Sequence, residues 1–385
     1  MLKSMSRIRQ VTTNPYKYAA SWKKQTGKPV VGCVPMYFPE ELIHASGALP
    51  IIIQKSQSLI TLGSMHMDNY FCHFVRGTVD MIAKKFLNVL DLIVIPDTCV
   101  QQRGMAQVLR HMQSKLPVEL VMFPIQIGDQ SGFDQAVNCL NRFRNKLADL
   151  TGSSISDDNI EKSIRLYNEH RQLMEQIYDM RRQSVGRLSS RDILEIVQSS
   201  MIMSKEEHIE YLKNLIIELE KSNESGDNKI RICVSGHFCS SPPVELLEII
   251  EEMEGIIVDD DLYIGYRYFA ESDVKIGGPI EQLANRYVFR RIPTPTRFDP
   301  ENDWREYLVK MVKNANAQGL IYLVPKYCDP LLIWFPDIKK KFKEENIPIL
   351  MIETEHEGFS LAREKTRIRK LMEVIKGLNV NNFKY

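Results

Sequence analysis

The stretch LDLIVIP, residues 90–96, is apolar without interruption from Leu92 to Pro96 and ends at a proline. A strand with one solvent-exposed face alternates apolar and polar residues, whereas a strand covered by helices on both faces is apolar throughout. The stretch therefore predicts a central strand of a parallel sheet, with chemistry expected just beyond its carboxyl end.

Similar runs occur at both ends of the chain and are separated by helix-like stretches. In the first half they are KPVVGCVP (28–35), ALPIIIQ (48–54) and VELVMFP (118–124). In the second half they are KIRICVSG (229–236), GIIVDDD (255–261), GLIYLVP (319–325) and IPILMIE (347–353). With four strands in each half, we expect an α/β fold of two Rossmann- or flavodoxin-like parallel-sheet domains.

The segment between the two halves lacks strand-like runs and places its apolar residues at helical spacing. Ser156 and Ser190 are suitable helix caps within it. The polar turn SNESGDN, residues 222–228, ends it. We therefore expect an N-terminal α/β domain at residues 1–155, a helical connector at 156–225 and a C-terminal α/β domain at 226–385.

Composition excludes several classes of protein. The 385 residues carry a formal net charge of +1, which gives no broad field for binding nucleic acid. The start of the chain lacks the apolar run of a signal peptide, and no stretch of about 18 apolar residues occurs, so we expect no membrane association and a cytoplasmic location. Seven cysteines, an odd number, argue against a disulfide framework and leave buried thiols, catalysis or metal binding.

Four cysteines lie at or near positions where parallel sheets place their ligands. Cys99, Cys239 and Cys328 each follow a predicted strand, and Cys72 begins a helix expected to run to about Leu87. Ligands of such folds bind outside the carboxyl ends of the strands. Cysteines from both halves would therefore meet at a cleft between the two domains.

The spacing of Cys72, Cys99 and Cys328 does not by itself identify a metal site, because the chain has no C-x₂-C run. The alternative is that these thiols are small buried hydrophobes, as we expect for Cys139 on a helix and Cys233 in a strand. The chain also lacks a phosphate-binding loop, a G-x-G-x-x-G fingerprint and a zinc motif. Neither ATP hydrolysis nor hydride transfer from NAD is expected of it.

Several blocks resemble the benzoyl-CoA reductase / 2-hydroxyacyl-CoA dehydratase family, in the same order along the chain. They are GKPVVGCVPMYFPEELIHASGALPIII (27–53), NYFCHFVRG (69–77), IPDTCVQQRG (95–104), VDDDLYIGYRYF (258–269) and KYCDPLLIWFPDIKKKFKEENIPILMIETE (326–355). In the first block the matching residues are Tyr37, Pro39, Glu40, Glu41, Ala45, Gly47 and Pro50. Tyr263 departs from the pattern, which often has cysteine there, so the subfamily stays open.

The resemblance implies a [4Fe–4S] cluster held by Cys72, Cys99 and Cys328, with the fourth iron open to a non-protein ligand. It also implies an acyl-CoA substrate, a homologous second subunit and a separate ATP-hydrolysing iron–sulfur protein that supplies a low-potential electron. Thiolates are soft ligands that suit such clusters. The chain would then be the cluster subunit of an oxygen-sensitive enzyme.

Four functions are compatible with these observations. The first is a benzoyl-CoA reductase-like subunit that transfers electrons to an aromatic acyl-CoA. The second is a subunit of an (R)-2-hydroxyacyl-CoA dehydratase, and the third is a non-catalytic partner that relays electrons or stabilises the complex. The fourth is a two-domain ligand-binding protein without a metal.

Glu40 is the expected catalytic residue. It follows a strand at the cleft, and its carboxyl group could move a proton if burial raised its pKa. The alternative is an ordinary helix start, with Pro39 in the first helical position and acids favoured by the helix dipole. His44, one turn later, is expected as a satisfied core histidine, with contact to a catalytic side chain as the alternative. Arg103 and Arg267 are expected in solvated surface ion pairs, with binding of CoA phosphates as the alternative.

Overall fold

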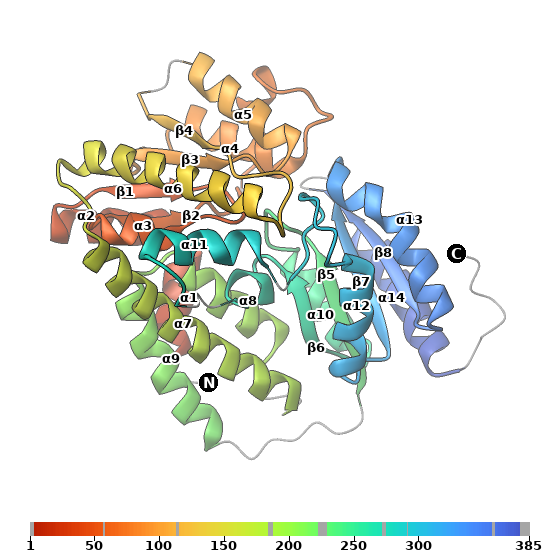
Figure 1. Ribbon diagram of the computed structural model, residues 1–385. Helices are drawn as coiled ribbons and strands as arrows, with labels where there is room; N and C mark the ends of the chain where they lie inside the picture. Colours follow the sequence, from red (N-terminus) through yellow and green to blue (C-terminus); the bar gives the residue numbers. More distant parts are fainter. Residues whose placement is uncertain are drawn as a thin grey trace.

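The computed structural model describes residues 4–56, 58–112, 115–183, 188–221, 229–271, 275–290, 292–355 and 359–377. It contains two parallel four-stranded sheets flanked by helices (Figure 1), which confirms the predicted fold class. The first sheet has the order β2-β1-β3-β4 and the second the order β6-β5-β7-β8. The polar turn predicted at 222–228 lies outside the described residues.

The strands coincide with the predicted apolar runs. In the first sheet they are β1 (Val30–Cys33), β2 (Leu49–Ile52), β3 (Leu92–Pro96) and β4 (Val118–Val121). In the second sheet they are β5 (Ile230–Gly236), β6 (Gly255–Leu262), β7 (Gly319–Pro325) and β8 (Ile349–Thr354). Every residue of β3 and β7 is buried, as expected for central strands covered on both faces.

Both sheets have the same winding, in which the first strand lies between the second and the third. β1 therefore pairs with β2 and β3, and β5 pairs with β6 and β7. In such sheets ligands bind where the winding reverses, at the carboxyl ends of the two central strands. Each half of the chain thus presents one binding edge, after β1 and β3 and after β5 and β7.

Helices cover both sheets and fill the space between them. Those of the first half are α1 (Met5–Thr13), α2 (Pro15–Thr26), α3 (Glu40–Ala45), α4 (His73–Ala83), α5 (Val100–His111) and α6 (Gln130–Thr151). The middle segment forms α7 (Asp157–Gln183), α8 (Ser190–Ser200) and α9 (Lys205–Glu220). The second half adds α10 (Val244–Glu252), α11 (Pro279–Val288), α12 (Trp304–Asn314), α13 (Asp329–Glu344) and α14 (Leu361–Ile375).

Helices of the two halves pack against each other. In Figure 1, α11 from the second half, in cyan, lies beneath α6 of the first half, and it also contacts α7. The N-terminal helix α1 packs on α8, and α8 packs on α10. The middle segment therefore supports both sheets. Within the described residues, no helix is both long enough and apolar enough to cross a membrane.

The predicted helix ends agree with the structure to different degrees. Ser156 caps α7, since its Oγ accepts the backbone N–H of Asn159 at 3.2 Å, which confirms that prediction. The cap predicted at Ser190 was wrong by one residue: Ser189 caps α8 through a capping box with Asp192. The acid three residues later selects between the two adjacent serines. The helix that follows Cys72, α4, ends at Ala83 rather than near residue 87.

Candidate functional site

Three cysteines occupy the same position relative to three different helices. Cys72, Cys99 and Cys328 are the N-cap residues of α4, α5 and α13. The first backbone N–H groups of a helix have no partner within it, and the N-terminus carries a partial positive charge. Each thiol thus lies where thiolates and other anions are stabilised.

The three thiols line one cavity between the two sheets, and Cys239 lines it as a fourth. The lining residues of this thiol cavity are Met36, Cys72, Phe74, Val75, Thr98, Cys99, Gln101, Gln102, Phe238, Cys239, Ser240, Thr296, Pro325, Cys328, Asp329 and Pro330. The remaining cysteines, Cys33, Cys139 and Cys233, are buried. The structure thus brings together the four cysteines expected at or near the sheet edges, three of which the family resemblance marks as cluster ligands.

Gln101, two residues after Cys99, joins the loops of the other two cysteines. Its Oε1 accepts the backbone N–H of Cys72 at 2.7 Å, and its Nε2 donates to the carbonyl of Tyr327, the neighbour of Cys328, at 2.7 Å. One side chain therefore fixes the relative positions of three loops. The sequence contained no signal for this role beyond a glutamine in the first turn after a cysteine.

The thiols are held neutral by their surroundings when no cation is near. Burial raises the pKa of Cys72 to about 12, while the backbone N–H groups of Val75 and Phe74 act in the opposite direction. Burial also raises the pKa of Cys328, and repulsion from Cys72 and Cys99 raises it further. Several thiolates in one apolar cavity need a compensating positive charge, which an iron–sulfur core supplies.

The donors that line the thiol cavity are cysteine sulfurs, and thiolates are soft ligands that suit iron–sulfur clusters. In the described part of the chain, no group of three or more His, Cys, Asp or Glu side chains is arranged to hold a metal ion. Thr98 lines the cavity, and its buried Oγ1 has no hydrogen-bond partner among the described residues. This hydroxyl is free to donate to a cluster sulfide, so the residues fit such a group.

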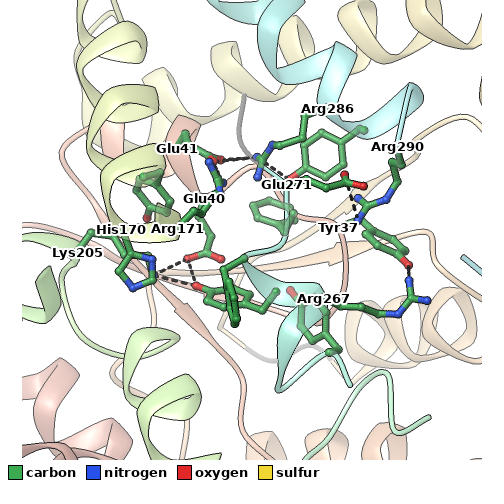
Figure 2. A pocket seen from close by; sticks show the side chains of 16 residues that line it. Tyr37, Glu40, Glu41, His170, Arg171, Lys205, Arg267, Glu271, Arg286 and Arg290 are labelled. Atoms are coloured by element: carbon green, nitrogen blue, oxygen red, sulfur yellow. Dashed lines mark hydrogen bonds and ion pairs between the residues drawn. The ribbon is translucent and has the colours of Figure 1, made fainter. Parts of the chain in front are cut away.

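Glu40 lies in a different, polar cavity between α3, α9 and the segment after β6 (Figure 2). Its carboxylate accepts a hydrogen bond from the Tyr268 hydroxyl at 2.8 Å and pairs with Nζ of Lys205 at 3.3 Å. All four cysteines of the thiol cavity are absent from the described residues that line this one. The structure therefore does not bring Glu40 to the cysteines. Pro39 is the N-cap of α3 rather than its first residue.

Glu41, next to Glu40, ties three parts of the chain together (Figure 2). It forms ion pairs with Arg171 of α7 and with Arg286 of α11, the latter at 2.8 Å. Burial opposes ionisation, but Arg286 and Arg171 outweigh it and lower the pKa of Glu41 to about 2. The pairs link α3 to the middle segment and to the second half.

The remaining residues singled out from the sequence have structural partners. His44 contacts Ser163 Oγ at 2.8 Å and Glu206 at 3.0 Å. Arg267 pairs with Asp261 at 2.7 Å, but both side chains are buried, so the solvated surface ion pair expected for Arg267 was wrong. Arg267 also lines the polar cavity that holds Glu40.

Comparison with known proteins places the chain in a family. The family model described as 2-hydroxyglutaryl-CoA dehydratase, D-component, matches residues 35–375. One of the subunits of benzoyl-CoA reductase from Thauera aromatica is 28% identical over 86% of this chain and 87% of its own length. The (R)-phenyllactyl-CoA dehydratase beta subunit of Clostridium sporogenes is 26% identical over 96% and 97%. The beta subunit of (R)-2-hydroxyglutaryl-CoA dehydratase from Acidaminococcus fermentans is 24% identical over 95% and 97%.

Proposed function

Because the chain belongs to the 2-hydroxyglutaryl-CoA dehydratase D-component family, we propose that it is the [4Fe–4S] subunit of an ATP-dependent, low-potential radical enzyme acting on acyl-CoA thioesters. Cys72, Cys99 and Cys328 are the proposed iron ligands. The observation that carries the proposal is their convergence on one cavity from three helix starts. The family membership itself confirms the resemblance predicted from the sequence.

The surrounding residues would serve such a cluster in defined ways. Gln101 holds the loops of Cys72 and Cys328 in register, and Thr98 offers a hydroxyl donor to a sulfide. The helix N-termini favour the negative charge of the thiolates. When bound, the cluster supplies a one-electron donor whose potential depends on hydrogen bonds to its sulfurs and on its exposure to solvent.

Two reactions are candidates, because relatives of both kinds match nearly the whole chain. We place first the transfer of electrons to an aromatic acyl-CoA, since one relative is part of a benzoyl-CoA reductase. Dehydration of an (R)-2-hydroxyacyl-CoA is the second, since the beta subunits of two such dehydratases are also relatives. Turnover of aromatic and 2-hydroxyacyl thioesters under strict exclusion of oxygen distinguishes them.

Two protein partners belong to the proposal. A second subunit is expected because the relatives are named as subunits of larger enzymes. A separate ATP-hydrolysing iron–sulfur protein is expected from the family resemblance, and this sequence has no phosphate-binding loop of its own. The assay therefore needs both partners, ATP and a strong reductant.

Glu40 is the proposed proton-handling residue. Its carboxylate is buried, faces a polar cavity and accepts a hydrogen bond from the hydroxyl of Tyr268. A carboxylate in such a place can exchange protons with a bound substrate, provided that the acyl group reaches the cavity. Replacement of Glu40 by glutamine tests this role separately from the cluster.

Purification without oxygen tests the cluster directly. We expect a brown protein with about four iron atoms per chain. Cys328→Ala should lose the cluster, whereas Cys139→Ala, a buried cysteine outside the cavity, should retain it. A colourless, iron-free protein after anaerobic reconstitution, or equal iron in the two variants, would contradict the proposal.

A further inference from the structure

The loop after β5 brings a fourth thiol to the cavity. Cys239 is partly exposed, as Cys72, Cys99 and Cys328 are, while the other three cysteines of the chain are buried. It also lines the same cavity as those three. We propose that Cys239 is the fourth thiolate ligand of the cluster, so that a protein sulfur closes the iron that a three-cysteine site leaves open.

The side chain of Gln102 positions this sulfur. Its Nε2 donates to Cys239 Sγ at 3.3 Å and also to the carbonyl of Pro35 after β1. Gln101 and Gln102 are consecutive, and between them they contact the loops of Cys72, Cys328 and Cys239. The first turn of α5 therefore organises four cysteine-bearing segments, including its own.

The loop that carries Cys239 is fixed from both sides. His237, at φ 49°, contacts Thr354 Oγ1 at 2.7 Å and Ser240 Oγ at 3.2 Å. Ser240 in turn lies 3.3 Å from Nε2 of His73, the residue after Cys72. At Gly236, φ 103°, a side chain would collide with the carbonyl of Leu323, so the turn requires glycine. These hydrogen bonds and this turn hold the side chain of Cys239 in place before the cluster binds.

Cys239 shares the lining of one cavity with Cys72, Cys99 and Cys328. Four thiolates around one core also match the usual Cys₄ coordination of [4Fe–4S] clusters.

This inference rests on the proposed function and selects among its alternatives. With four protein ligands, no iron is left for a thioester oxygen, so the subunit would accept one electron from the ATP-hydrolysing donor and pass one electron to an acyl thioester bound by the second subunit. The described residues that line the thiol cavity include no lysine or arginine to pair with CoA phosphates. An electron-relay role follows, and it replaces the alternative in which Glu40 exchanges protons with a substrate bound to this chain.

Mild oxidation provides the test, because a cluster with an open iron loses that iron whereas a four-cysteine cluster keeps it. The reconstituted wild-type chain is treated anaerobically with ferricyanide, and iron content and the electron paramagnetic resonance spectrum are recorded. We expect wild type to keep all its iron, and Cys239→Ala to lose about one iron in four and show the signal of a three-iron cluster. Cys233→Ala, the buried cysteine of β5, should behave as wild type.

The iron content of wild type and the iron content of Cys239→Ala, both measured after oxidation, keep the outcomes separate. If wild type loses one iron and Cys239→Ala does the same, the cluster is open and this inference fails while the proposed function stands. If wild type binds no iron, the proposed function fails as well. Should Cys239→Ala not fold, Cys239→Ser and the iron retention of wild type decide: loss of one iron from wild type overturns the inference.

Discussion

The backbone N–H of Cys72 donates to the side chain of Gln101 at 2.7 Å, and the same side chain donates to the carbonyl of Tyr327. These contacts cross 29 and 226 residues of sequence. The distance between two of the proposed iron ligands, Cys72 and Cys328, thus depends on one glutamine that binds no iron itself.

Gln101→Leu should weaken the site without removing a ligand. The substitution leaves two backbone groups unpaired at a partly buried position, each at a cost of about 1–3 kcal/mol. We expect a lower free energy of unfolding and a faster loss of iron to a chelator, both measured on the reconstituted protein.

The matched control is Gln107→Leu, since Gln107 is an exposed residue of the same helix α5. It should keep the wild-type rate of iron loss. Equal rates in the two variants would show that Gln101 does not position the site.

The strands, and the four thiols at or near the sheet edges, could be predicted because their signals are local. A strand buried on both faces needs a continuous apolar run, and β3 and β7 have one each. A residue that follows such a strand must lie at the carboxyl edge of the sheet, as Cys99 and Cys328 do. Burial and chain direction alone determine these positions.

The contacts that join distant segments could not be predicted in this way. The packing of α11 on α6 and the bridge made by Gln101 both depend on how the two halves meet. Glu40 was expected beside the cysteines because it also follows a strand. Its helix instead faces Lys205 of α9, a partner that no local pattern identifies.

Glu40→Gln should destabilise the fold whatever its catalytic role. Lys205 is buried, and the substitution removes the carboxylate that pairs with it. Breaking a buried ion pair from one side costs about 3–5 kcal/mol. The free energy of unfolding measures this loss, with Glu206→Gln, a half-exposed acid on the same helix as Lys205, as the mild control.

The turnover of the Glu40→Gln variant then distinguishes a catalytic role of Glu40 from a structural one. If Glu40 handles a proton, the folded, iron-loaded variant should lose turnover with each acyl-CoA while keeping its iron content and spectrum. Undiminished turnover at full iron loading would assign Glu40 to the ion pair with Lys205 alone.

A pair of buried histidines should make the fold sensitive to acid. His170 Nε2 lies 3.0 Å from His208 Nδ1, and burial lowers the pKa of His208 from 6.5 to about 3. Both imidazoles stay neutral in the fold, while the unfolded chain binds protons below about pH 6.5. The unfolded state therefore gains protons as the pH falls from about 6.5 toward 3, and stability decreases over that range.

His208→Asn should flatten this dependence, because asparagine does not titrate. Free energies of unfolding at pH 7.5 and pH 5 measure the effect, and the variant should lose less stability between them than wild type. His111→Asn, on the exposed end of α5, should leave the difference unchanged. A wild-type slope in His208→Asn would rule out the histidine pair as its origin.

Arg286 should contribute more to stability than a surface arginine of the same half, because it links α11 to Glu41 of α3 in the interior. Arg286→Gln leaves Glu41 with one cationic partner, so the pKa of Glu41 should rise from about 2 toward its ordinary value of 4.5. In wild type the depressed pKa stabilises the fold above about pH 4.5, and that contribution is lost as the pH falls toward 2. The free energy of unfolding of the variant should be about 3–5 kcal/mol lower at neutral pH and should depend less on pH below 4.5.

The control is Arg305→Gln, which breaks a half-exposed pair with Asp303 and should lower the free energy of unfolding by at most about 1 kcal/mol. Equal losses in the two variants would show that the Glu41 pair does not hold the halves together.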